Sequence, residues 1–100
     1  MADYLNLLSD LIAKAKADRK GDAPLQAEPI LSLAPYRANL EYRPGNGPPS
    51  VHEKDAEMFY VLDGAATLVT GGKLVDEKRT NEANLTGTAI ADGNKQPIAK

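Results

Sequence analysis

The chain has 100 residues and a net charge of −2, with one histidine and no cysteine. This length fits one small domain with a small core. The lack of cysteine excludes disulfides, thiolate nucleophiles and cysteine-based zinc sites, and the charge provides no basic surface for nucleic acid. No apolar run is long enough to span a membrane, and Asp3 and Asp10 argue against a secretory signal. We therefore expect a cytoplasmic protein without nucleic-acid or membrane partners.

Residues 3–19 are predicted to form an amphipathic helix that ends before Gly21 and Pro24. Its apolar residues follow the i, i+3, i+4, i+7 spacing of one helix face: Tyr4, Leu5, Leu7, Leu8, Leu11, Ile12 and Ala15. The favoured interpretation is a helix packed on a sheet or on a partner chain. A membrane-surface helix is the alternative, which acidic residues on the polar face disfavour. This pattern divides the chain into an N-terminal helix, residues 1–22, and a β domain, residues 23–100.

Short apolar pieces separated by proline follow the helix, at residues 25–28 and 30–33. Pro29 and Pro35 cannot donate a ladder hydrogen bond, so we expect them at strand ends, edges or bulges. Residues 37–42 alternate between polar and apolar side chains, which predicts a half-buried strand.

The strongest strand prediction covers residues 57–63, where both faces are largely apolar and burial on both sides is expected. Residues 66–70 form the next expected strand, and Gly71-Gly72 a tight hairpin turn into residues 73–75. The last expected elements are a loop at 76–84, a weaker strand at 85–91, a turn at 92–94 and a strand at 96–100. The alternation predicts a common interior formed by Leu40, Phe59, Val61, Leu68 and Ile90.

A chemically suggestive pattern lies between residues 42 and 72. A glycine- and proline-rich loop leads to the single histidine, His52; Glu57 follows five residues later, and Gly64 seven residues after that. This pattern resembles the first conserved motif of the cupin superfamily, which has a glycine, two histidines one residue apart, a glutamate and a later glycine. His52 matches the second histidine and Glu57 the glutamate, whereas Ser50 stands where the family has its first histidine.

The resemblance implies a mainly β fold, a cupin-like double-stranded β-helix (jelly roll) with one N-terminal α-helix. The second cupin motif, with its proline, glycine and third histidine, does not occur in the 100 residues and is expected after Lys100. The chain is therefore expected to contain the first part of the barrel without the strands that close it.

The resemblance also implies a metal site. In cupins the two histidines, the glutamate and the later histidine bind a divalent transition metal, and only His52 and Glu57 carry over. We therefore expect weak binding of Mn, Fe, Ni or Zn, because two protein ligands leave most of the coordination sphere to water. In the alternative, His52 is an ordinary polar residue at a strand end, and Glu57 makes a structural hydrogen bond or lies at an open rim.

Two functions are compatible with this sequence. The first is a cupin-like protein that binds a small polar ligand, with a metal site in the barrel. The second is a non-catalytic, truncated or degenerate cupin module with a structural or oligomerisation role. An open sheet edge and an uncovered apolar face recruit other chains, so we expect a homo-oligomer. The sequence assigns no catalytic residue and does not decide whether the protein is an enzyme.

Overall fold

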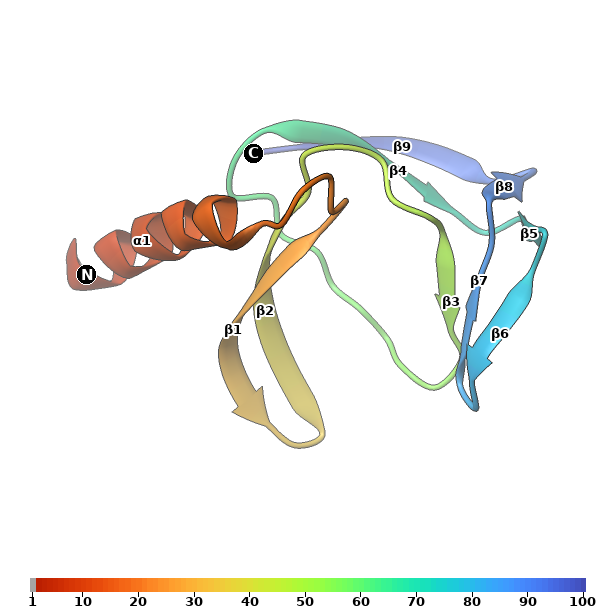
Figure 1. The fold of residues 1–100 in the computed structure, drawn as a ribbon, viewed down its shortest axis with the longest axis horizontal. Helices are drawn as coiled ribbons and strands as arrows, with labels where there is room; N and C mark the ends of the chain where they lie inside the picture. The colour runs from red at the N-terminus through yellow and green to blue at the C-terminus, as the bar shows by residue number, and fades with distance from the viewer. Residues whose placement is uncertain (1) are drawn as a thin grey trace. The chain divides into compact units, whose positions relative to one another are not determined.

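The computed structural model describes residues 2–100, and describes side-chain surroundings from Leu7 onward. The described chain is mainly β, with one helix, α1 (Ala2–Asp18), followed by antiparallel strands. Four small sheets form, and none of them closes into a barrel within the described residues (Figure 1). The strands are β1 (Gln26–Leu33), β2 (Tyr36–Tyr42), β3 (Ser50–His52), β4 (Ala65–Thr70), β5 (Lys73–Val75), β6 (Lys78–Asn81), β7 (Asn84–Thr86), β8 (Ala89–Ala91) and β9 (Asn94–Ala99).

The chain forms two compact units, Met1–Gly47 and Pro48–Lys100. The first contains α1 and the β1–β2 hairpin, and the second contains the strands β3 to β9. The predicted separation of a helix at residues 1–22 from a β domain at residues 23–100 stays a prediction.

In the first unit, α1 packs against β1 and β2, which confirms the helix as a packing element. Its least exposed side chains, Leu8, Leu11, Ile12 and Ala15, follow the predicted spacing, while the side chains of Tyr4 and Leu5 lie outside the described residues. In β1 the register shifts between Pro29 and Leu31, so Pro29 lies at a bulge, one of the three positions expected for it. The buried carboxylate of this unit, Glu28, is only 6% exposed. It is satisfied by Lys14 Nζ at 3.2 Å and Gln26 Nε2 at 3.4 Å.

The second unit is organised by one long antiparallel ribbon. Its arms run from β4 through β5 to β6 and back from β7 through β8 to β9 (Figure 1). The pairs Ala65↔Ala99, Leu74↔Ile90 and Lys78↔Thr86 keep the same register through both bends. The register shifts by one residue only near the hairpin end, between Arg79 and Asn81. The three paired segments therefore form a single hairpin, which turns at Glu82-Ala83, and β3 adds to it by pairing with β7.

The ribbon is interrupted at two places, and each interruption involves both arms. Gly71 and Gly72, with φ of 70° and 69°, lie opposite Asp92, with φ of 59°. At the second place Asp76, with φ of 52°, lies beside Thr88, whose N–H donates to Val75 O at 2.9 Å. Left-handed backbone conformations at these positions bend the ribbon without changing its register.

The prediction of a strand at residues 57–63 is wrong. None of the strands that the structure describes pairs with this segment, and its residues have no strand conformation. Met58, Phe59 and Tyr60 are 91%, 51% and 83% exposed, so the predicted burial on both faces is also wrong. A strand forms only where a neighbouring strand satisfies its backbone groups, and β propensity does not provide that neighbour.

Two further predictions are corrected by the ribbon. Gly71-Gly72 is not a hairpin turn, because β4 pairs with β9 and β5 pairs with β8. Residues 76–84 are not a loop, because β6 lies within them and pairs with β7. The weaker strand predicted at 85–91 is divided between β7 and β8. Turn residues show where a chain bends, whereas the pairing depends on partners that are distant in sequence.

The predicted common interior is not formed. Leu40 is buried, at 6% exposure, but it belongs to the first unit, whereas the other four residues belong to the second. Val61, Leu68 and Ile90 are half-buried and Phe59 is exposed. The predicted strands 66–70 and 96–100 are confirmed as β4 and β9, and strand 37–42 as β2.

The two glycines of the first bend provide a matched test of how closely the two arms of the ribbon approach each other there. A Cβ at Gly72 would lie 2.2 Å from the carbonyl oxygen of Ala91, whereas a Cβ at Gly71 would meet nothing within 4 Å. Since both have positive φ, Gly71→Ala should cost about 1 kcal/mol of unfolding free energy from backbone strain alone. Gly72→Ala should cost about 3 kcal/mol or more, because the opposite arm must move. Urea denaturation followed by circular dichroism measures both, and equal losses would contradict the described bend.

Candidate functional site

The candidate site begins on β3, which carries Ser50 and His52. The strand follows the glycine- and proline-rich loop, whose end is attached to the ribbon by Thr86 Oγ1, which donates to Pro49 O at 3.0 Å. Side chains two residues apart on a strand share a face. Ser50 Oγ accordingly lies 3.4 Å from His52 Nε2, as the sequence pattern predicts.

Glu57 joins these two residues after the turn at Glu53-Lys54. Its Oε1 lies 3.2 Å from His52 Nε2, with side-chain exposures of 47% for Glu57 and 38% for His52. Glu57 does not lie on the strand predicted for residues 57–63; it lies on an irregular segment and is half-exposed. The structure nevertheless brings Ser50 and Glu57 to the same imidazole nitrogen, Nε2 of His52.

The separation of Nε2 and Oε1 fits a shared metal ion. Two ligand atoms about 2.1 Å from a metal lie about 3.0 Å apart at a right angle and about 3.4 Å apart at a tetrahedral angle. The observed 3.2 Å falls between these values and equally fits a hydrogen bond from a protonated imidazole to the carboxylate. Among the residues that the structure describes, no group of three or more His, Cys, Asp or Glu side chains could hold a metal ion. A metal here would therefore have two strong protein ligands.

Two hollows in the second unit border the site. Ser50 and His52 line one of about 610 Å³, whose apolar wall includes Val69, Leu74 and Ile90. The other, of about 670 Å³, is lined by Glu57 together with residues that include Phe59, Tyr60, Leu68 and Ile98.

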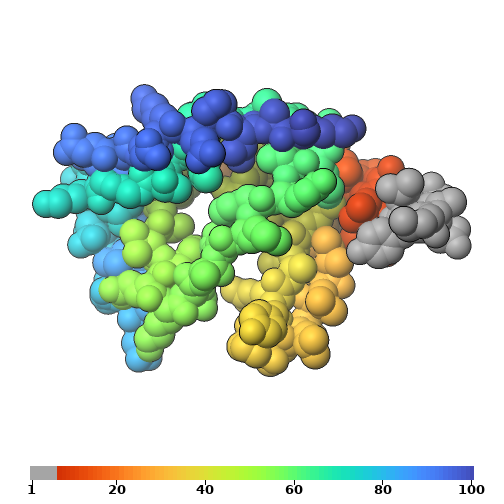
Figure 2. Space-filling view, turned by 180° about the vertical axis from the view of Figure 1, so that it is seen from behind, coloured from red at the N-terminus to blue at the C-terminus, as the bar shows by residue number. Residues whose placement is uncertain are grey.

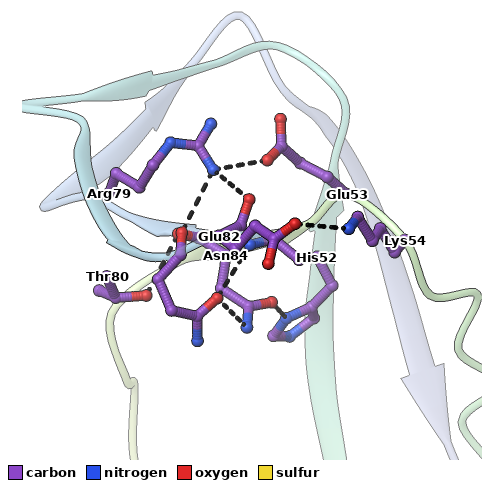
Figure 3. A network of polar contacts seen from close by, with 9 residues as sticks. His52, Glu53, Lys54, Arg79, Thr80, Glu82 and Asn84 are labelled. Atoms are coloured by element: carbon purple, nitrogen blue, oxygen red, sulfur yellow. Dashed lines mark hydrogen bonds and ion pairs between the residues drawn. The ribbon is translucent and has the colours of Figure 1, made fainter.

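A hydrogen-bond network supports the other side of the imidazole (Figure 3). His52 Nδ1 lies 2.7 Å from Asn84 Oδ1. Asn84 Nδ2 in turn donates to Asn81 Oδ1 at 2.9 Å. Neither asparagine is predicted as a site residue from the sequence, because both fall in the predicted loop at 76–84. Their turn-forming character in the segment NEAN was the available signal for the hairpin end.

An exposed ion pair holds the hairpin end against the turn that follows β3. Arg79 Nη1 donates to Glu53 Oε1 at 2.7 Å, and also to the backbone oxygens of Glu82 at 3.0 Å and Asn81 at 3.3 Å (Figure 3). Lys54 Nζ and Glu82 Oε1 form a second pair at 3.2 Å. The hydrogen bond from Arg79 lowers the pKa of the Glu53 carboxyl, and Glu53 raises the pKa of Arg79. Salt weakens such exposed pairs.

Comparisons with protein-family models, with curated proteins and with solved structures yield no match. Within residues 2–100, no helix combines the length and the apolar character needed to cross a membrane. The cytoplasmic location stays a prediction.

The ion pair of Arg79 and Glu53 makes stability depend on pH in a defined direction. Because the folded-state pKa of Glu53 is lowered, the pair stabilises the fold above the pKa of the unfolded chain, and this contribution is lost as the pH falls through the lowered value. Arg79→Gln should move the pKa of Glu53 back toward its ordinary value. Its stability deficit relative to the wild type should shrink below about pH 4.

NMR titration of the Glu53 carboxyl carbon and urea denaturation at neutral and acid pH measure these two effects. The control is Lys78→Gln, which removes the neighbouring positive charge on β6 without removing a bond to Glu53. An equal response of the pKa of Glu53 to both variants would show that Arg79 acts only through its positive charge and not through its hydrogen bond to Glu53.

Proposed function

We propose that this protein is a cupin-like small-molecule-binding protein with a weak divalent-metal site formed by His52 and Glu57. The observation that carries the proposal is the 3.2 Å separation of His52 Nε2 and Glu57 Oε1, with Ser50 Oγ 3.4 Å from the same nitrogen. An imidazole nitrogen and a carboxylate oxygen suit Mn, Fe, Ni and Zn, and Ser50 adds a weak neutral oxygen.

The hollow beside His52 supports the ligand part of the proposal. Its wall combines apolar side chains, such as Leu74 and Ile90, with the polar groups of Ser50, His52 and Asp55. Small-molecule pockets commonly have this composition, in which an apolar lining provides affinity and a few polar groups orient the ligand. A small polar molecule could contact the metal and this wall together.

The long ribbon supports a jelly-roll arrangement for the second unit. A jelly roll is a double-sheet β architecture built from antiparallel strands. The ribbon formed by β4–β9, bent at Gly71-Gly72 and again at Asp76, supplies paired strands of this kind.

Titration calorimetry with Mn²⁺, Ni²⁺ and Zn²⁺ tests the metal site on protein purified without a histidine tag. Ser50→His places a second imidazole two residues from His52 on the same strand face, and should tighten binding about tenfold or more, which corresponds to about 1.4 kcal/mol. Glu57→Gln keeps the shape of the side chain but removes the anionic ligand, and should weaken binding by a similar factor.

The outcome of this titration decides whether the motif is a metal site. If Ser50→His binds no better than the wild type and Glu57→Gln binds no worse, His52 and Glu57 form only a hydrogen bond. The resemblance to cupins would then be limited to the strand pattern.

A second candidate function is self-association, and the exposed surface of the chain favours it. The chain exposes 8195 Å². A compact monomer of 10.7 kDa exposes about 5,500 Å², and two separate compact bodies of half that mass expose about 6,600 Å² together. The excess is at least about 1,500 Å² per chain, whereas a standard protein interface buries about 800 Å² per partner.

The irregular segment at residues 57–61 is the surface that we assign to this contact. Met58 and Tyr60 are 91% and 83% exposed, and the segment lies at the surface of the face shown in Figure 2, in green. None of the described strands uses its backbone groups, so they remain open to pairing. A second copy of the chain offers the same segment and the same hollow, which suits a two-fold dimer.

Light scattering at micromolar concentration tests self-association. We expect the mass of a dimer or of a larger species for the wild type. Replacing both Met58 and Tyr60 by Ser should weaken association about tenfold or more, because large exposed side chains dominate such contacts. Tyr36→Ser is the matched control, since Tyr36 is 75% exposed but belongs to the first unit. A monomeric wild type would refute this function.

A further inference from the structure

We propose that Asn84 is a positioning residue that selects the tautomer of His52. By accepting a hydrogen bond from Nδ1–H, Asn84 leaves Nε2 without a proton beside Ser50 and Glu57, against the preference of the Glu57 carboxylate for Nε2–H. The inference deepens the proposed metal site, on which its functional meaning rests. The tautomer itself can be measured in the absence of any metal.

The assignment starts from a backbone group whose role is fixed. The amide N–H of Ala83 can only donate, and it lies 2.9 Å from the side-chain atom Oδ1 of Asn81. That atom must therefore be the oxygen of the Asn81 amide rather than its nitrogen.

The same reasoning extends to Asn84 and then to His52. The atom of Asn84 that lies 2.9 Å from Asn81 Oδ1 must be a donor, so it is the amide nitrogen Nδ2. The other side-chain atom of Asn84, 2.7 Å from His52 Nδ1, is then the oxygen. An amide oxygen and a carboxylate oxygen both only accept, so Asn84 Oδ1 and Glu57 Oε1 compete for the single proton of the neutral ring. The contact with Asn84 is the shorter, 2.7 Å against 3.2 Å, and it assigns the proton to Nδ1 and the lone pair to Nε2.

Strand pairing holds these three residues in a row across the sheet β3–β7–β6. His52 is the register partner of Asn84, and Asn84 is the register partner of Asn81. Directly opposed residues on antiparallel strands have neighbouring side chains. Thr80 Oγ1 also donates to the backbone oxygen of Asn84 at 3.2 Å, which further fixes its position (Figure 3).

This arrangement has the form of a supported metal ligand. A histidine that binds a metal through one ring nitrogen usually donates its other N–H to a carbonyl or carboxylate oxygen, which fixes the tautomer and the ring orientation. Here the supporting oxygen belongs to Asn84, and the remaining nitrogen lies 3.2 Å from Glu57 Oε1. The support is thus built into the fold, independently of any bound ion.

Because His52 is the only histidine, its ring nitrogens can be observed without overlap. We would record long-range ¹H–¹⁵N spectra of the ¹⁵N-labelled full chain in metal-free buffer at alkaline pH, where the protonated and lone-pair nitrogens are well separated. The wild type should show predominantly the Nδ1–H form. Asn84→Ala should lower the ratio of Nδ1–H to Nε2–H about fivefold or more, the effect expected for the loss of one hydrogen bond.

Asn81→Asp is the matched control, because it keeps the oxygen that accepts from Ala83 and Asn84 and should leave the tautomer unchanged. A predominant Nε2–H form in the wild type overturns the inference, even if Asn84→Ala does not fold. An unchanged tautomer ratio in folded Asn84→Ala also overturns it.

Adding Zn²⁺ to the same wild-type sample separates this inference from the proposed function. A predominant Nδ1–H form without any zinc-induced shift of Nε2 would support the role of Asn84 and refute the metal site. A predominant Nε2–H form with a zinc-induced shift would refute the role of Asn84 and leave the metal site standing.

Discussion

The antiparallel register of the ribbon from β4 to β9 is the constraint on which the second unit depends. The same register holds across both bends, from Ala65↔Ala99 to Lys78↔Thr86. Side chains alternate between faces along a strand, so a slip of one residue would turn each side chain to the opposite face. The one-residue shift after Arg79 then places Asn81 opposite Asn84, whose partner on the other side is His52, so strand pairing both builds the sheet and supports the imidazole.

The hydrophobic core of this structure is small, and the second unit is organised by backbone pairing. Among the residues whose side chains are described, the buried apolar ones are Ala15 and Leu40, both in the first unit. Much apolar surface in the second unit remains accessible, including Met58 and Tyr60. Hollows beside His52 and Glu57 are therefore open to a ligand, and the surface at residues 57–61 is open to a second chain. Both proposed functions arise from this incomplete burial.

Local sequence patterns predicted the elements that depend on local physics. The spacing of Leu8, Leu11 and Ala15 predicted the helix and its packed face, and alternation predicted β2, β4 and β9. The strand predictions that failed all concern pairing. The segment 57–63 has strong β propensity but no strand beside it, and Gly71-Gly72 bends one arm of a ribbon where a hairpin was expected. Propensity describes how well a residue fits a sheet, not whether a neighbouring strand is present.

The candidate site also has one part that the sequence predicted and one part that only the tertiary structure decided. The sequence alone determined that Ser50 and His52 share a strand face, because side chains two residues apart on a strand lie on the same side. It also placed Glu57 near enough in the chain to return to them after a short turn. Only the tertiary structure placed Asn84 against His52, across 32 residues of sequence. The partner of a side chain across a sheet depends on which strands pair and in which register, and distant backbone hydrogen bonds decide this.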